Sequence, residues 1–177
     1  LGRMLVERGG GRVAMADPAR NCYYEDGMLT WDIPEGAQVL SLHRDSADCY
    51  ARGGHVIIKS GIGGADAYDE ALADAVAAIF PGRADKIREV GWLKNANQAS
   101  ARGIPYRLVE LGFISDAEDC RIFEERTGDI ADAILAAFGV LPARPVEPSP
   151  EPEPEPPAGR YTEDFSGGTY RCAVDSL

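Results

Sequence analysis

The segment Tyr106–Asp119 constrains the fold most, because it places an acidic residue inside a short apolar strand that a helix follows. The run Tyr106–Leu111 is predicted to be a buried strand that stops at Gly112. An unpaired buried carboxylate is costly, so Glu110 needs a partner or a chemical task. Ser115 stands three residues before a glutamate, the spacing of a capping box, so we expect a helix to begin there. Open α/β sheets place their chemistry where such strands end.

Strands and amphipathic helices alternate along the rest of the chain. Apolar runs predict further strands at Arg12–Met15, Val39–His43 and Val56–Lys59. Asp66 and Asp129 are expected to cap two helices. Their apolar residues recur at helical spacing: Leu72, Val76, Ile79 and Phe80 in the first, and Ile130, Ile134, Leu135 and Phe138 in the second. This alternation predicts an α/β fold, with a mostly parallel twisted sheet and helices on both of its faces.

Composition excludes some classes of partner. The 177 residues allow one ordinary domain plus a tail, and the net charge of −11 leaves no basic patch for nucleic acid. No apolar run approaches the roughly 20 residues that a membrane span needs. The four cysteines (Cys22, Cys49, Cys120 and Cys172) form no Cys-x-x-Cys pair. Free thiols in a protein made in a reducing cytosol are therefore favoured over a metal or redox site.

The ordered set of motifs resembles the zinc-dependent N-acetylmuramoyl-L-alanine amidases of the amidase_3 family, which includes autolysins and phage endolysins. Tyr106–Asp119 resembles the family's Leu-Val-Glu-x-Gly-Phe-x-Ser signature, and Val39–His43 its strand ending in Ser-Ile-His. Gly53–Ile58 is similar to the next strand, Asn97–Pro105 to the loop before the catalytic strand, and Asp129–Phe138 to the closing helix. The resemblance covers residues 1–140, which we therefore expect to form the catalytic domain.

The resemblance also implies the chemistry of the site. His43 corresponds to a zinc ligand, and Glu110 to the catalytic carboxylate that moves a proton during amide hydrolysis. The alternative for Glu110 is a carboxylate satisfied by backbone N–H groups or by Arg107. His55 has no ligand counterpart in the family, so a structural or exposed histidine is favoured there. Asp45 stands where the family commonly has Asn, which leaves its contact with substrate in doubt.

Two of the family's zinc ligands have no counterpart in this sequence. The family's first strand carries Asp-x-Gly-His-Gly with one zinc histidine, and its first helix carries a glutamate ligand. Leu1–Gly10 reads like the last turns of that helix. We therefore expect the chain to start inside the catalytic domain, without its first strand and most of its first helix, and to be inactive by itself.

A different composition follows residue 140. Residues 141–160 form a Pro/Glu-rich linker, which we expect to be extended polyproline II because proline lacks the N–H that helices and sheets need. A ligand for SH3 or WW domains is the less favoured alternative. Residues 161–177 resemble the first strand of a bacterial SH3-like wall-binding domain.

The resemblance implies a peptidoglycan hydrolase that cuts the amide between N-acetylmuramic acid and L-alanine of the stem peptide, with zinc as its cofactor. Such a protein is made in the cytoplasm and acts on the bacterial cell wall after lysis or secretion. The linker and tail favour an endolysin over an autolysin. Two alternatives stay open: an inactive remnant or wall-binding fragment, and an unrelated α/β hydrolase. The second is less favoured, since the chain has no Gly-x-Ser-x-Gly elbow and only Cys49 stands near a histidine.

Overall fold

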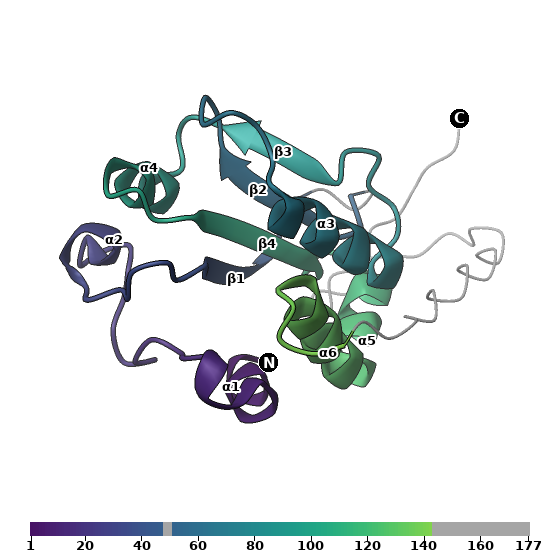
Figure 1. The fold of residues 1–177 in the computed structure, drawn as a ribbon. Coiled ribbons are helices and arrows are strands. Elements are labelled where there is room, and N and C mark those ends of the chain that lie inside the picture. Colours follow the sequence, from purple (N-terminus) through teal and green to yellow (C-terminus); the bar gives the residue numbers. More distant parts are fainter. Residues whose placement is uncertain (48–50, 143–177) are drawn as a thin grey trace, which may run out of the picture.

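The computed structural model describes residues 1–47 and 51–142 (Figure 1). Helices and strands follow one another through this part of the chain. Their bounds are α1 Gly2–Gly9, a short 3-10 helix η1 Gly10–Arg12, α2 Gly27–Thr30, β1 Val39–Asp45, β2 His55–Lys59, α3 Ala67–Ile79, β3 Ile87–Val90, α4 Lys94–Ala101, β4 Tyr106–Phe113, α5 Ala117–Glu125 and α6 Thr127–Ala137.

The strands form one four-stranded sheet in the order β1-β4-β2-β3. β1 runs parallel to β4, and β2 runs parallel to β3. The two pairs meet in an antiparallel contact between β2 and β4. The sheet is therefore mostly parallel, as predicted, with β4 at its centre and β1 as one of its two outer strands.

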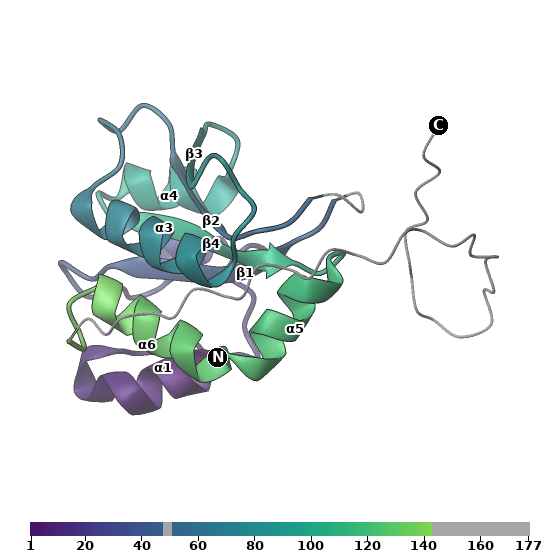
Figure 2. The same ribbon diagram turned by 90° about the vertical axis from the view of Figure 1, so that its right-hand side faces the viewer.

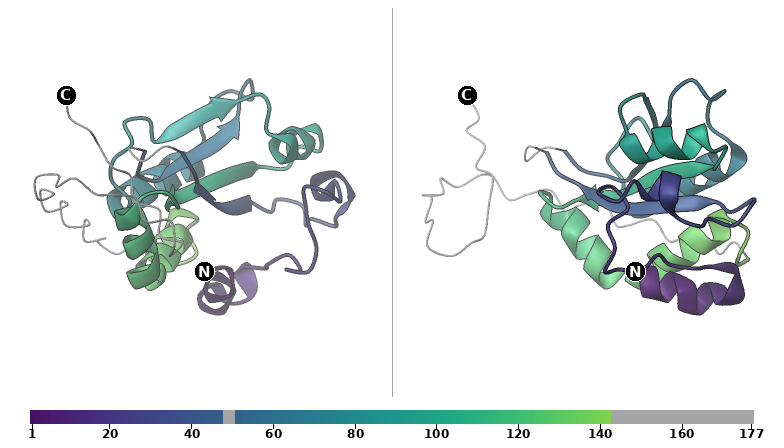
Figure 3. Two further views of the ribbon diagram at one scale, coloured as in Figure 1. Left: turned by 180° about the vertical axis from the view of Figure 1, so that it is seen from behind. Right: turned by 90° about the vertical axis from the view of Figure 1, so that its left-hand side faces the viewer.

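Helices cover both faces of the sheet, which confirms the predicted α/β class. One face carries the larger core under α3 and α6, with α1 packed beside α6 (Figure 2). The opposite face carries a smaller core under α2 and α4, which lie at one end of the sheet when it is seen from behind (Figure 3). Side chains alternate along a strand, so β4 sends Val109 and Leu111 to the first core and Tyr106 and Leu108 to the second.

A buried ion pair ties β4 to α3 on the first face. Arg107 is 2% exposed, and its guanidinium donates to the carboxylates of Asp66 and Asp69. Asp66 is also the N-cap of α3 and forms a capping box with Asp69, as the sequence predicted for the cap. Both carboxylates are therefore occupied by structural partners, and Arg107 lies on the face of the sheet opposite to Glu110.

The carboxyl end of β4 is held in place by a second buried carboxylate. Asp119 on α5 is fully buried and accepts hydrogen bonds from the backbone N–H groups of Gly53, at 2.8 Å, and Phe113, at 2.9 Å. Gly112 has φ +72°, and two residues of β4 stand opposite Arg44 of β1 at this point. This irregularity lets β4 continue through Gly112 to Phe113, whereas the sequence predicted that the strand would stop there.

Several predicted elements were wrong. Arg12–Met15 is not a strand: Arg12 ends η1, and the next residues have no regular structure. The segment predicted as the loop Asn97–Pro105 begins inside α4. The sequence also missed β3.

Two predicted helix caps were wrong as well. The N-cap of α5 is Asp116, whose carboxylate accepts from the Asp119 N–H, and not Ser115. The N-cap of α6 is Arg126, and Asp129 lies inside the first turn, where it pairs with Arg126. In both cases a helix follows as predicted, and only its first residue differs.

The linker at 141–160 and the SH3-like tail at 161–177 fall, from residue 143 onward, outside the described residues. Across 1–47 and 51–142, every helix is too short or too polar to cross a bilayer.

Candidate active site

Three titratable side chains form a row across the sheet. His43 of β1 pairs in register with Glu110 of β4, and Glu110 pairs in register with His55 of β2. Residues paired in register point to the same face of a sheet, so all three lie on the face of the smaller core. The structure thus brings together the two residues that the sequence singled out, and it adds His55 as a third.

Glu110 lies in an environment that disfavours its charge. The residue is 8% exposed, and its Oε2 atom makes no hydrogen bond. Burial and, to a smaller extent, the charge of Asp45 raise the pKa of Glu110 to about 7, and the charge of Arg83 opposes the rise. Arg107 does not satisfy this carboxylate, because its guanidinium donates to Asp66 and Asp69 on the other face of the sheet. A carboxyl group that titrates near neutral pH can both accept and return a proton.

His55 is fully buried beside Glu110. Its two ring nitrogens make no hydrogen bonds, and its ring lies 6.4 Å from that of Phe113. The Nε2 atom is 3.8 Å from Oδ2 of Asp45. Burial and the charge of Arg83 lower the pKa of His55 to about 4, so the imidazole is neutral at physiological pH. The exposed alternative that the sequence allowed for His55 is therefore excluded.

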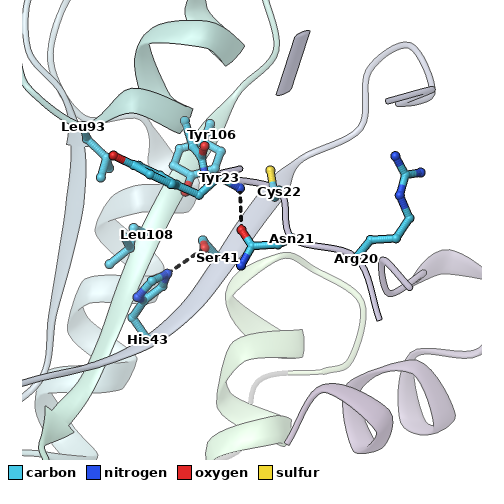
Figure 4. Close-up of a pocket in the computed structure, with 10 residues that line it drawn as sticks. Arg20, Asn21, Cys22, Tyr23, Ser41, His43, Leu93, Tyr106 and Leu108 are labelled. Atoms are coloured by element: carbon cyan, nitrogen blue, oxygen red, sulfur yellow. Dashed lines mark hydrogen bonds between the residues drawn. The ribbon is translucent and has the colours of Figure 1, made fainter. Parts of the chain in front are cut away.

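His43 is the accessible member of the row. Its side chain is exposed, and its Nε2 atom lies 3.1 Å from the Ser41 hydroxyl on the same strand (Figure 4). Partial burial lowers the pKa of His43, which favours the neutral ring. A neutral imidazole with an accessible nitrogen is the form that binds metal ions.

A cavity of about 380 Å³ adjoins His43 on this face of the sheet. Its floor is formed by Ser41, His43 and Leu108, and Tyr106 and Leu93 line one side. The irregular segment Arg20–Tyr23 also lines the cavity (Figure 4). Asn95 completes the lining. Sequence reasoning missed this cavity, because nothing in the local pattern of residues 20–23 shows that they fold back over β1.

The residues that the structure describes contain no group of three or more His, Cys, Asp or Glu side chains that could hold a metal ion. Cys22 and Cys120 are free thiols. Cys49 and Cys172 lie outside the described ranges.

No family model matches the chain. Several solved structures are similar to the chain, and two of them illustrate the shared fold. They are an N-acetylmuramoyl-L-alanine amidase from Clostridium difficile 630 (TM-score 0.53, 13% identity, 76% of this chain and 78% of that one) and the CwlD amidase from Clostridioides difficile in complex with the GerS lipoprotein (TM-score 0.53, 12% identity, 72% and 69%). Both confirm a helix-flanked α/β sheet of the amidase type.

A curated relative is more similar in sequence but much longer. Probable autolysin PH from Staphylococcus aureus (strain NCTC 8325 / PS 47) is 36% identical over 96 residues, which is 54% of this chain and 19% of that protein. The catalytic domain of the CD27L endolysin aligns with a TM-score of 0.47 and 21% identity, over 58% of this chain and 54% of that domain. The chain thus spans about a fifth of the autolysin and about half of the endolysin domain.

Proposed function

We propose that this chain is part of a peptidoglycan hydrolase that cuts the amide between N-acetylmuramic acid and L-alanine of the stem peptide. The observation that carries the proposal is the in-register pairing of His43 with Glu110 in the carboxyl-terminal halves of two parallel strands. The amidase fold of the similar structures and the autolysin relative support the same activity.

Glu110 is the proposed acid–base group. Its pKa of about 7 means that the carboxylate and the carboxylic acid are both well populated at neutral pH. As a carboxylate it can take the proton of an attacking water, and as an acid it can return that proton to the leaving amine of L-alanine. Its unpartnered Oε2 atom leaves one oxygen free for this exchange.

Zinc is the proposed cofactor, with His43 as one ligand. Zinc in a hydrolase is held by three protein ligands. When bound, it would polarise the substrate carbonyl and lower the pKa of a water molecule. The described residues do not meet this requirement, because no group of three possible ligands is present among them. His43 fits the role of a single ligand by its accessible, neutral ring.

The shortage of metal ligands in the described part of the chain favours a second candidate: a remnant or wall-binding fragment without catalysis. An endolysin is the favoured setting for the active form, since the linker and SH3-like tail suggest a modular lytic enzyme. The active amidase and the fragment without catalysis differ in a measurable property, namely whether Glu110 is needed for wall hydrolysis.

The test compares the 177-residue chain with an extended form, in which a strand carrying Asp-x-Gly-His-Gly and a helix carrying a glutamate, both taken from a similar amidase, precede Leu1. Bound zinc is measured for each, together with the clearing of purified cell walls and the release of new amino termini. We expect clearing by the extended form, its loss in Glu110→Gln with zinc retained, and reduced zinc in His43→Ala. Clearing by the 177-residue chain with stoichiometric zinc would contradict the ligand assignment. No clearing by the extended form would contradict the amidase activity.

A further inference from the structure

The cavity beside His43 is lined by groups without free charge. Arg20 is one of its lining residues, but its guanidinium donates to the Glu25 carboxylate at 2.8 Å and lies 4.6 Å from the centre of the Trp31 ring. Figure 4 shows the Arg20 side chain extending away from His43. The nearby Lys94 is paired with Asp26 at 2.9 Å. Neither cation is therefore available to bind a carboxylate in the cavity.

The polar atoms of the lining are hydroxyl and amide groups. The Tyr106 hydroxyl and the Oδ1 atom of Asn95 are buried; the hydroxyl interacts with the side chains of Ser41 and Asn95, but no well-formed hydrogen bond joins them. Ser41 carries a third polar group, which lies against His43. A buried polar atom without a partner costs free energy, so a ligand that bonds to it gains affinity. These atoms select a ligand with uncharged hydrogen-bonding groups.

The remaining lining is apolar or aromatic. Leu93 and Leu108 offer aliphatic surface, and Tyr23 and Tyr106 offer aromatic rings. The Tyr23 side chain is 54% exposed, so its ring is accessible from solvent. An apolar lining with a few placed hydrogen-bonding groups is the usual composition of a small-molecule site.

We propose that this cavity binds the N-acetylated amino sugar of the substrate, that is, the acyl side of the amide that is cut. The assignment rests on the proposed function. An acetamido sugar is uncharged: its amide and hydroxyl groups match Asn95, Tyr106 and Ser41, and its methyl group matches the leucines. The stem peptide carries carboxylates, for which the cavity has no free cation. A sugar held there leaves the amide at His43 and Glu110 and directs the peptide away from the cavity.

The experiment is an NMR titration of the 177-residue chain with three probes: N-acetylglucosamine, glucose, and the dipeptide L-alanyl-D-isoglutamine. We expect N-acetylglucosamine to shift the backbone signals of Ser41, Tyr106 and Leu108 with a dissociation constant of about 1 mM, a typical value for a single sugar. Glucose, which lacks the acetamido group, and the dipeptide should leave these signals in place. Shifts caused by the dipeptide, equal shifts with glucose, or no shift with any probe would overturn the proposal.

Two variants and their controls locate the site. Tyr106→Phe removes only a hydroxyl that makes no well-formed hydrogen bond, so the fold should tolerate it, and we expect about fivefold weaker binding of N-acetylglucosamine. Tyr23→Ala should also weaken binding. The matched controls are Tyr68→Phe, on the opposite face of the sheet, and Trp92→Ala, an aromatic residue that is 68% exposed and outside the lining. Equal binding by Tyr106→Phe and the original chain would contradict the assignment.

This titration is independent of hydrolysis. Sugar binding at the cavity without wall clearing by any form would leave the site standing and defeat the proposed activity. Wall clearing by the extended form without sugar binding at the cavity would support the proposed activity and contradict the sugar site.

Discussion

Glu110 and His55 lie opposite each other in the antiparallel register of β4 and β2, and burial shifts their pKa values in opposite directions. The pKa of Glu110 rises to about 7 and that of His55 falls to about 4. Protons bound by Glu110 favour the folded state, so its contribution to stability is lost as pH rises toward 7. Protons bound by His55 favour the unfolded state, so its contribution is lost as pH falls toward 4. Between these limits the two effects oppose each other.

Removing the Glu110 carboxylate should leave His55 as the member of this pair that makes stability depend on pH. The original chain loses stability as pH rises because Glu110 gives up its proton, and Glu110→Gln has no such proton to lose. The free energy of unfolding of the variant minus that of the original chain should therefore increase by about 3 kcal/mol between pH 4.5 and 7. Urea unfolding at a series of pH values measures this difference. A constant difference across that range would show that Glu110 titrates near its ordinary pKa of 4.5.

Removing the histidine should have the mirrored effect. At low pH the original chain loses stability because His55 binds a proton more readily when unfolded, and His55→Leu lacks this group. The free energy of unfolding of the variant minus that of the original chain should therefore increase by about 3 kcal/mol as pH falls from 6.5 to 4. The same unfolding series measures it. His43→Leu is the control, because its exposed ring should give a smaller change. A flat difference for His55→Leu would contradict the lowered pKa.

The buried ion pair on the other face should be sensitive to loss of one partner. Arg107→Met leaves the Asp69 carboxylate buried without its cation, and we expect a loss of about 3–5 kcal/mol in the free energy of unfolding. Arg3→Met, an exposed arginine on α1, should change stability by less than about 0.5 kcal/mol. Equal effects of the two substitutions in urea would show that the pair contributes little.

The left-handed glycine of β4 should resist substitution for two reasons. A Cβ at Gly112, where φ is +72°, would lie 2.8 Å from Cβ of Asp119. Gly103 has a similar φ of +68° but open space around it. We expect Gly103→Ala to cost about 1 kcal/mol from backbone strain alone. Gly112→Ala should cost clearly more, about 2–4 kcal/mol, because it also displaces Asp119. Thermal unfolding of both variants separates strain from crowding.

The strands that carry the site were predictable, because their apolar runs are short, buried and bounded by turn residues. Val39–His43 and Tyr106–Leu111 were recognised on that basis, although both strands extend further. β3 was missed because two of its four residues are exposed and charged. α4 was missed since its sequence, Lys-Asn-Ala-Asn-Gln-Ala-Ser-Ala, buries only two alanines and therefore has no apolar stripe.

The site itself was only partly visible in the sequence. His43 and Glu110 stood out because each carries a titratable group near the end of an apolar strand. The burial of His55 could not be read from the sequence, since it follows from the antiparallel pairing of β2 with β4. The cavity could not be read either, because Tyr23 and Asn95 are brought to it by tertiary packing across more than one element.

The position of β1 at the margin of the sheet has a consequence for how this site can be controlled. No described strand bonds to the outer side of β1, so its backbone donors and acceptors there are open to a further strand. Any segment that docks on this margin, whether from the same chain or another, sets its side chains next to His43. A strand added at this margin would therefore narrow the access of ligands to His43.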